Sequence, residues 1–411
     1  MNYIINTCLF LLMFLFTVSP VKSQETLKIM YYNLLTFPQT QADRIDTLKK
    51  ITNYVQPDVF VVNELTSFNG GAQILNNALN VGGIQYYSSA VFYDGPDTDN
   101  LLFYNSNKLV LISQFQIPTA LRDISEYVLY YKDPNLPNTL DTTYLYFYSA
   151  HLKAGSQQSD MYLRYQEAQD FNSYLINKNR TTNLFVGGDF NIYENTEQAC
   201  QEILNGGNVT LVDPVNKMGS WHNNIGYQSY HTQSTRVNTG GYGGGSSGGM
   251  DDRFDFVFVS PDVMTGNSGI QYVTNSYKAV GQDGQHFNGD INIPTNNAVP
   301  NDIASALFYM SDHLPVKMEI SIGGDVGVVS SNDFINRAYV NKENNLIIYL
   351  NDNAECKSLT IYDISGKKIL TEKYVNNNYI TQNVAMLSSG IYIGSLLIDG
   401  KYTNFKFLIS K

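Results

Sequence analysis

Hydrophobic positions along the first third of the chain alternate between short continuous runs and runs with helical spacing. Apolar residues recur every third or fourth position over 45–55, which predicts a helix with one apolar face. Continuous apolar, β-prone runs at 27–32 and 59–62 flank it and predict strands. This part of the chain is therefore expected to form a strand, helix, strand unit.

The same alternation continues to about residue 320. A second helix is predicted around 161–175, where apolar residues lie at spacings of four, three and seven, and a strand follows at 183–186. Many strands with few helices between them favour a mixed-sheet sandwich flanked by helices over a doubly wound sheet. The remaining predicted strands are 101–104, 144–149, 254–259 and 316–320.

The N-terminus has the pattern of a secretory signal peptide. An apolar run of 11 residues, Cys8 to Val18, is followed by Ser-Pro and by a small residue, Ser23, before Gln24. A membrane anchor is the alternative, but spanning a bilayer takes about 20 apolar residues. The region before the run has no Lys or Arg, so only the terminal amine is positive. We expect residues 1–23 to be removed and no transmembrane segment in the mature chain.

The C-terminal part differs in pattern from the rest. Residues 323–331 (GGDVGVVSS) read as a linker, and residues 332–411 contain only short predicted strands with turn signals such as Asp363 to Gly366. The chain is therefore expected to have a large domain at 24–322 and a small β-sandwich domain at 332–411.

A glycine-rich stretch lies within the large domain. Residues 240–249 (GGYGGGSSGG) have no apolar period and predict a flexible loop. The alternative is a phosphate-cradling loop, but the stretch lacks the Gly-Lys-Ser/Thr ending and does not open a predicted helix. We expect it to be a loop.

The charge and the cysteine content of the chain restrict the kinds of binding site that it can have. The chain has 37 acidic and 26 basic residues, a net charge of −11 and a pI near 4.9, which argues against a broad basic surface for nucleic acid. Metal ions would have to attract a polyanionic substrate. Cys8 leaves with the signal peptide, and Cys200 and Cys356 fall in different predicted domains, so neither a disulfide nor a zinc site is expected.

Polar residues suited to metal-assisted hydrolysis follow or end the apolar runs. Carboxylates, amides and histidines can hold a hard cation and move protons. Each residue alone has a simpler explanation as a turn, a cap or a solvated acid, and Asp255 alone could be a buried acid paired with Arg253, although burying both charges is costly. The set is Asn33, Glu64, His151, Asp189, Asn191, Asp255, Asp312 and His313.

In this order the set resembles the endonuclease/exonuclease/phosphatase, or DNase I-like, superfamily. The resemblance covers about 27–320 and is specific in GGDFN (187–191), in the Arg-x-Asp strand at 253–255 and in SDHLP (311–315). It implies an α+β fold, a four-layer αββα sandwich of two mixed sheets with helices outside. It also implies that the site lies at one end of the paired sheets.

The resemblance implies a metal site. Glu64 corresponds to the principal Mg²⁺ ligand, and Asn33 and Asp312 complete or support the coordination. Mg²⁺ suits few carboxylates and several waters. Whether Mn²⁺ or Ca²⁺ also binds stays open.

The resemblance also assigns proton-transfer roles. Asp189 and Asn191 correspond to the pair that orients the attacking water and a phosphate oxygen, and His313, bonded to Asp255, to the base or the phosphate-stabilising imidazole. His151 corresponds to the leaving-group acid. Which histidine is acid and which is base stays open. Asp99, just before a predicted strand, is the expected carboxylate partner of His151.

Two features narrow the branch of the superfamily. A histidine at 151 resembles DNase, sphingomyelinase and phosphatase members. The segment SYHTQSTR (229–236) resembles one in secreted bacterial members, in which His231 and Arg236 are either functional or structural. We expect a secreted nuclease that uses a metal-positioned water for in-line attack. The alternatives are a sphingomyelinase-like, phosphoinositide or small-phosphoester hydrolase and a non-catalytic surface-binding protein.

The last segment resembles the C-terminal sorting domain of the Bacteroidota type IX secretion system. The similarity lies in LTIYDISGKKIL, LSSGIYIGSL and the terminal KFLISK, and spans about 334–411. It implies passage through the periplasm to the cell surface or medium, with the type IX machinery as partner. A carbohydrate-binding sandwich is the alternative, because Tyr-rich strands also line sugar sites.

Overall fold

The fold is taken from a computed structural model. The predicted signal peptide (1–23) and linker (323–331) lie outside the residues that it describes, so both stay predictions. The described ranges are 25–39, 44–133, 143–240, 244–322, 335–341, 343–350, 356–363, 366–377, 379–398 and 401–409.

The first sheet of the large domain is mixed and has the strand order β10-β12-β1-β2-β4-β3, with β11 paired to β12. β1 runs parallel to β2 and antiparallel to β12. The predicted strand at 27–32 is the first half of a longer β1. The strands are β1 (Glu25–Phe37), β2 (Val59–Leu65), β3 (Tyr87–Ser89), β4 (Asp99–Asn105), β10 (Ile270–Tyr272), β11 (Lys278–Ala279) and β12 (Val316–Ile322).

The second sheet has the order β5-β6-β7-β8-β9. Only β7 and β8 are parallel within it. Its central strands β6 and β8 are buried along almost their whole length, as expected of strands covered on both faces. The strands are β5 (Leu109–Ile117), β6 (Ile124–Tyr131), β7 (Tyr144–His151), β8 (Leu184–Asp189) and β9 (Asp255–Val259).

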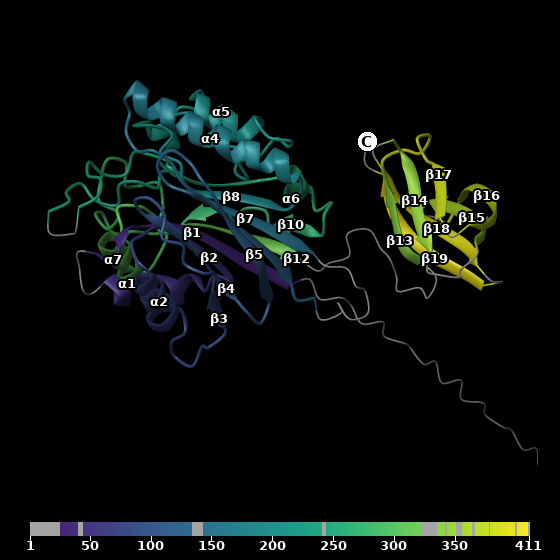
Figure 1. The fold of residues 1–411 in the computed structure, drawn as a ribbon, viewed down its shortest axis with the longest axis horizontal. Coiled ribbons are helices and arrows are strands. Elements are labelled where there is room, and N and C mark those ends of the chain that lie inside the picture. Colours follow the sequence, from purple (N-terminus) through teal and green to yellow (C-terminus); the bar gives the residue numbers. More distant parts are fainter. Residues whose placement is uncertain are drawn as a thin grey trace, which may run out of the picture.

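Helices cover the outer faces of both sheets (Figure 1). The two predicted helices are confirmed within α1 and α4, which lie on opposite sides of the sheet pair. The predicted four-layer αββα sandwich is therefore confirmed. The helices are α1 (Arg44–Val55), α2 (Phe68–Gln73), η1 (Ile74–Leu79), α4 (Gln158–Lys178), α5 (Gln198–Asn205), η2 (Ile225–Tyr227), α6 (Pro261–Thr265) and α7 (Asn301–Met310).

A tyrosine from the first sheet holds the two sheets together. The Tyr31 hydroxyl lies 3.2 Å from the carbonyl oxygens of Tyr148 and Phe185, which belong to β7 and β8. The Tyr31 ring passes so close to Gly187 that a Cβ there would lie 2.9 Å from it. The glycines of GGDFN therefore allow the sheets to approach each other at the end where the polar residues gather.

The C-terminal segment is all-β, as expected. Its strands form a three-stranded sheet, β13-β14-β17, and a four-stranded sheet, β16-β15-β18-β19, which share an apolar core. Cys356 is buried in this core, and Cys200 is buried in the large domain; both are free thiols. The strands are β13 (Ile335–Val340), β14 (Asn345–Leu350), β15 (Cys356–Asp363), β16 (Lys368–Asn377), β17 (Tyr379–Asn383), β18 (Gly390–Ile398) and β19 (Lys401–Ile409).

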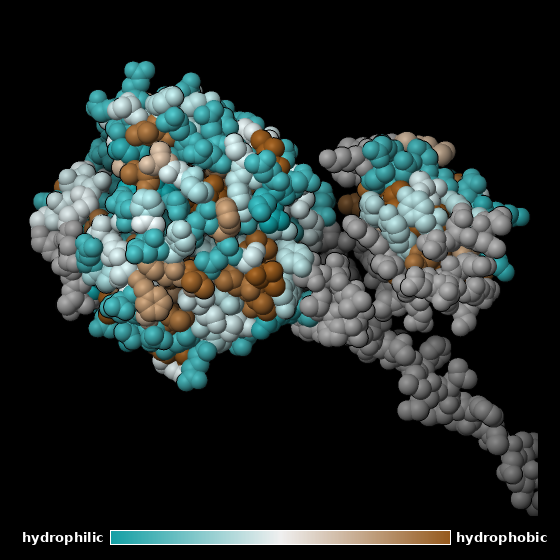
Figure 2. Space-filling view, in the orientation of Figure 1, coloured by the Kyte–Doolittle hydropathy of each residue, from teal (hydrophilic) through white to brown (hydrophobic). Residues whose placement is uncertain are grey.

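The surface is mostly polar. On the face drawn in Figure 2, hydrophilic residues predominate and hydrophobic ones occur in small groups, as on ordinary globular proteins. Within the described ranges, no helix is long and apolar enough to cross a membrane.

The contact of Tyr31 with Gly187 predicts a stability effect. Gly187→Ala should lower the free energy of unfolding by about 1 to 3 kcal/mol, because the added methyl group would overlap the Tyr31 ring and the Phe256 carbonyl oxygen. Gly240→Ala is the matched control, since a Cβ there meets nothing within 4 Å. Urea unfolding of both variants measures the difference. Equal midpoints for Gly187→Ala and the wild type would contradict the close approach.

Candidate active site

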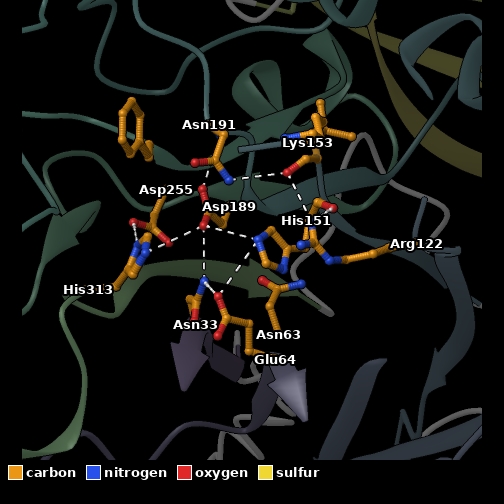
Figure 3. Close-up of polar contacts among 12 residues, drawn as sticks. Asn33, Asn63, Glu64, Arg122, His151, Lys153, Asp189, Asn191, Asp255 and His313 are labelled. Atoms are coloured by element: carbon orange, nitrogen blue, oxygen red, sulfur yellow. Dashed lines mark hydrogen bonds and ion pairs between the residues drawn. The ribbon is translucent and has the colours of Figure 1, made fainter. Parts of the chain in front are cut away.

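The polar residues singled out in the sequence meet at one end of the two sheets (Figure 3). Asn33 and Glu64 come from β1 and β2 of the first sheet. His151, Asp189 and Asp255 end or begin β7, β8 and β9 of the second, and strand register places them side by side. The two sheets together bring Asn33 within hydrogen-bond distance of Asp189, 156 positions away in the chain.

Asn33 lies between two carboxylates. Its Nδ2 donates to Glu64 Oε1 (2.9 Å) and to Asp189 Oδ2 (3.0 Å), whereas its Oδ1 accepts from the Leu35 amide (2.9 Å). Glu64 Oε2 accepts from the Thr36 amide at 2.8 Å. In this arrangement Asn33 presents an N–H group, not an oxygen, to the centre. It positions the two carboxylates, and the oxygen expected to bind metal is turned toward the backbone.

His313 is held by an acid, as expected. Its Nδ1 lies 2.8 Å from Asp255 Oδ2, and its Nε2 lies 3.5 Å from Asp189 Oδ2. Burial alone would lower the pKa of His313, but the carboxylates of Asp255, Asp189 and Asp312 outweigh burial and raise its pKa well above the ordinary value. The surrounding carboxylates therefore favour the charged form of His313.

His151 has the opposite character. Burial, reinforced by the positive charges of Arg122 and His313, lowers the pKa of His151 well below its ordinary value. Its Nε2 faces the centre, 3.6 Å from Asp189 Oδ2 and 3.8 Å from Glu64 Oε1. The two histidines thus differ in charge on either side of Asp189.

The expected pairing of His151 with Asp99 is wrong. His151 Nδ1 is buried and has no hydrogen-bond partner among the described residues. Asp99 lies at the start of β4 and accepts instead from the Gly95 amide at 2.8 Å. The carboxylate is used to fold its own loop.

Asp189 is the most central acid. Burial, together with the negative charges of Asp255 and Glu64, raises the pKa of Asp189 to about 7, although His313 and Asn33 act in the opposite direction. Asp189 Oδ1 accepts from the Asn191 amide at 3.1 Å. Asn191 adopts a left-handed backbone (φ 51°) and donates its Nδ2 to the Leu152 carbonyl at 3.2 Å. The GGDFN turn therefore fixes both side chains at the centre.

Two overlapping groups of side chains fit a divalent cation. Ligand atoms of Glu64, His151 and Asp189 lie within 4.8 Å of one another, and so do those of Asp189, Asp255 and His313. The clustered carboxylates and the raised pKa of Asp189 indicate uncompensated negative charge, which a cation would neutralise. Carboxylate oxygens suit Mg²⁺ or Mn²⁺.

Asp312 belongs to neither group. Its Oδ2 accepts from the Ser246 amide (2.6 Å) and from Gln233 Nε2 (3.2 Å). Gly245 packs so tightly that a Cβ would lie 2.7 Å from Asp312 Cγ. Asp312 Oδ2 therefore secures the glycine-rich loop at the centre, and its proposed role in supporting the coordination stays a prediction. Gly244, Gly245, Ser247 and Gly248 are exposed, and the flexibility predicted for the loop stays a prediction.

Arg253 and His231 are structural. Both guanidinium nitrogens of Arg253 bind Asp213, at 2.9 and 2.8 Å, so the pairing of Arg253 with Asp255 does not form. His231 is fully buried and its Nε2 bonds to the Trp221 carbonyl at 2.8 Å. Neither side chain faces the catalytic acids.

Two side chains near the centre were missed by sequence reasoning. Gln233 Nε2 lies 2.6 Å from His313 Nε2, and Gln233 lies within the SYHTQSTR segment, which was the available signal. Asn63 is buried next to Glu64 and donates to Asn100 Oδ1 (2.6 Å) and Ser149 Oγ (3.0 Å), which joins the sheets below the site.

Comparison with known proteins agrees with this geometry. The model of the endonuclease/exonuclease/phosphatase family matches residues 30–313, and the chain belongs to that family. A second model, the secretion system C-terminal sorting domain, matches residues 342–410. Comparison with curated proteins finds no match.

Several solved structures are similar to this chain at low identity. A Danio rerio TDP2 complexed with a single-stranded DNA product is 15% identical (TM-score 0.46; 72% of this chain and 98% of that chain). An endonuclease/exonuclease/phosphatase family protein from Bacteroides thetaiotaomicron is 15% identical (TM-score 0.45; 73% of this chain and 99% of that chain). The human Nocturnin catalytic domain with bound sulfate is 16% identical (TM-score 0.46; 74% of this chain and 96% of that chain).

The metal geometry predicts unequal effects of two acid-to-amide changes. Glu64→Gln should weaken Mg²⁺ binding by roughly tenfold or more, because it removes a negative charge from the group formed by Glu64, His151 and Asp189. Glu64 is the carboxylate of that group that is partly exposed, whereas Asp189 is buried. Asp312→Asn should weaken Mg²⁺ binding much less, because Asp312 lies outside both cation groups and its Oδ2 accepts from Ser246 and Gln233. Isothermal titration calorimetry with Mg²⁺ compares them. A larger loss from Asp312→Asn would contradict the assignment.

Proposed function

We propose that this protein is a divalent-metal-dependent hydrolase of phosphoester bonds. The observation that carries the proposal is the position of the Asp189 carboxylate between the two histidines, with its Oδ2 3.5 Å from His313 Nε2 and 3.6 Å from His151 Nε2. Family membership supports phosphoester hydrolysis in general. A bound divalent cation would neutralise charge on the phosphate, and Glu64 with Asp189 would hold it.

The protein's own residues have separate roles in this proposal. Asp189 orients the attacking water, because its carboxylate lies at the centre of the site, next to Asn33 and His313. His313, kept charged by Asp255, donates a hydrogen bond to a phosphate oxygen. His151 faces the centre from the other side of Asp189 and is placed to contact the leaving oxygen.

Loss of either histidine should reduce turnover. His151→Ala and His313→Ala should each lower kcat by roughly 10² to 10⁴ on any substrate that the protein cleaves, because each removes a positioned proton donor or acceptor. Circular dichroism should show an unchanged fold. Wild-type turnover in either variant would remove that residue from the mechanism, and full activity in EDTA would contradict metal dependence.

The substrate expected from the sequence, nucleic acid, remains a prediction. The second candidate, a small phosphoester, is favoured by charge. Basic side chains near the site are already paired: Arg122 with Asp97 (2.8 Å), Lys153 with Asp160 (3.0 Å) and Arg164 with Glu197 (2.6 Å). Paired cations attract a phosphate chain weakly. Plasmid DNA, single-stranded DNA, RNA, sphingomyelin and aryl phosphates with Mg²⁺ would decide between the classes.

The C-terminal segment indicates export to the cell surface or extracellular space through the type IX system. No residue of the proposed site lies after His313. Deleting Ser330 to Lys411 should therefore leave an active enzyme that stays in the periplasm of its native host. Cell fractionation and turnover of the truncated and full chains test this. Normal export of the truncated chain would contradict the sorting role, and loss of all turnover would contradict the independence of the large domain.

A further inference from the structure

A cavity of about 670 Å³ opens beside the catalytic centre. Asn191 and Gln233 line it and also contact catalytic groups: the Asn191 amide bonds to Asp189, and Gln233 Nε2 lies 2.6 Å from His313 Nε2. Whatever is esterified to a phosphate at the centre can therefore extend into this cavity. The residues that line the cavity therefore indicate the chemistry of the group that it binds.

The lining is acidic. Asp251 and Asp252 contribute carboxylates, and none of the described lining residues is Lys or Arg. His222 Nδ1 lies 2.7 Å from Asp252 Oδ1, so a protonated His222 would only balance that carboxylate. Asp251 adds a second carboxyl group to the lining. A second phosphate, as in a nucleic-acid chain, would meet a carboxylate here without a compensating cation.

The other lining groups suit hydroxyls and a carbon skeleton. Ser156 and Ser247 are exposed at the cavity and offer hydroxyl groups. The rings of Tyr193 and Phe254 meet edge to face at 5.0 Å and, with Met161, form an apolar wall. Carboxylates accept hydrogen bonds from hydroxyls, and apolar rings pack against C–H groups.

A cationic group fits less well than a hydroxylated one. Recognition of a quaternary ammonium uses open aromatic faces. The Arg164 guanidinium already lies over the Tyr193 ring, 5.8 Å from its centroid, and the ring edges meet His222 and Phe254. A second cation at Tyr193 would be repelled by Arg164.

We propose that this cavity binds an uncharged, hydroxyl-rich group of the sugar or polyol class, esterified to the phosphate held at the catalytic centre. This inference rests on the proposed phosphoester hydrolysis. The water oxygen forms a bond to phosphorus, and the bond from phosphorus to the sugar oxygen breaks with its electron pair left on that oxygen. The proton removed from water is balanced by one delivered to the sugar oxygen. The products are the free sugar or polyol and phosphate.

The test compares substrates and one variant of the full chain with Mg²⁺. The wild type should cleave glucose 6-phosphate or inositol 1-phosphate with a kcat/KM at least about 100-fold above that for p-nitrophenyl phosphate. Asp251→Ala should lower the ratio of the two values about tenfold or more, mainly through KM, because hydroxyl contacts are lost while the reacting groups remain. Asp170→Ala, an exposed acid on α4 that does not line the cavity, should change neither value.

Each failure has a distinct signature. Hydrolysis of DNA or p-nitrophenyl phosphate without preference for sugar phosphates would overturn the inference and leave the proposed function intact. An unchanged substrate ratio in Asp251→Ala would also overturn it. No hydrolysis of any phosphoester would overturn the proposed function itself. If Asp251→Ala does not fold, inhibition of the wild type decides: free glucose or inositol should compete with p-nitrophenyl phosphate, and its failure to compete contradicts the inference.

Discussion

Buried negative charge is the constraint on which the site depends. Glu64, Asp189 and Asp255 converge where the two sheets meet, and isolated ionised carboxylates in such surroundings are costly. The protein offsets part of this cost with the Asn33 amide, which donates to Glu64 and Asp189. His313 offsets a further part, because its ring nitrogens lie 3.5 Å from Asp189 and 2.8 Å from Asp255. The raised pKa of Asp189 shows that compensation is incomplete. A divalent cation is the natural complement.

The sandwich makes this concentration of charge feasible. Acids from adjacent strands of one sheet lie in register, and the second acid-bearing sheet is held against them through the Tyr31 hydroxyl. Gly187 removes the side chain that would keep the sheets apart. The same close packing fixes His151 in a dry environment, where burial favours its neutral form. Charge difference between the two histidines is thus a consequence of packing.

The local sequence pattern was enough to predict the main helices and strands, but not every hydrogen-bond partner in the site. The 3.6-residue period marked α1 and α4, and polar residues beside apolar runs marked the end of the sheets where the acids gather. The bond between His313 and Asp255 is present as the family resemblance implied. The expected pairing of Asp99 with His151 was wrong because the Asp99 carboxylate binds a backbone amide of its own loop. Loop shape, unlike strand pattern, leaves little trace in hydrophobic periodicity.

Gln233 illustrates the same limit. Nothing in its type or spacing marks a glutamine for contact with a histidine 80 residues away, and the contact exists because its segment forms isolated bridges to both Asp252 and His313. The substrate cavity next to it is likewise assembled from separate loops. The chemistry of the proposed substrate could therefore be inferred only once the positions of the loops were known.

Locating a bound metal tests the central claim most directly. Crystals grown with Mn²⁺ should give an anomalous difference peak within coordination distance of Glu64 and Asp189, with Asp312 still bonded to the Ser246 amide. A peak on Asp312 in place of Asp189, or no peak among these acids at saturating Mn²⁺, would contradict the view that their uncompensated charge forms the metal site.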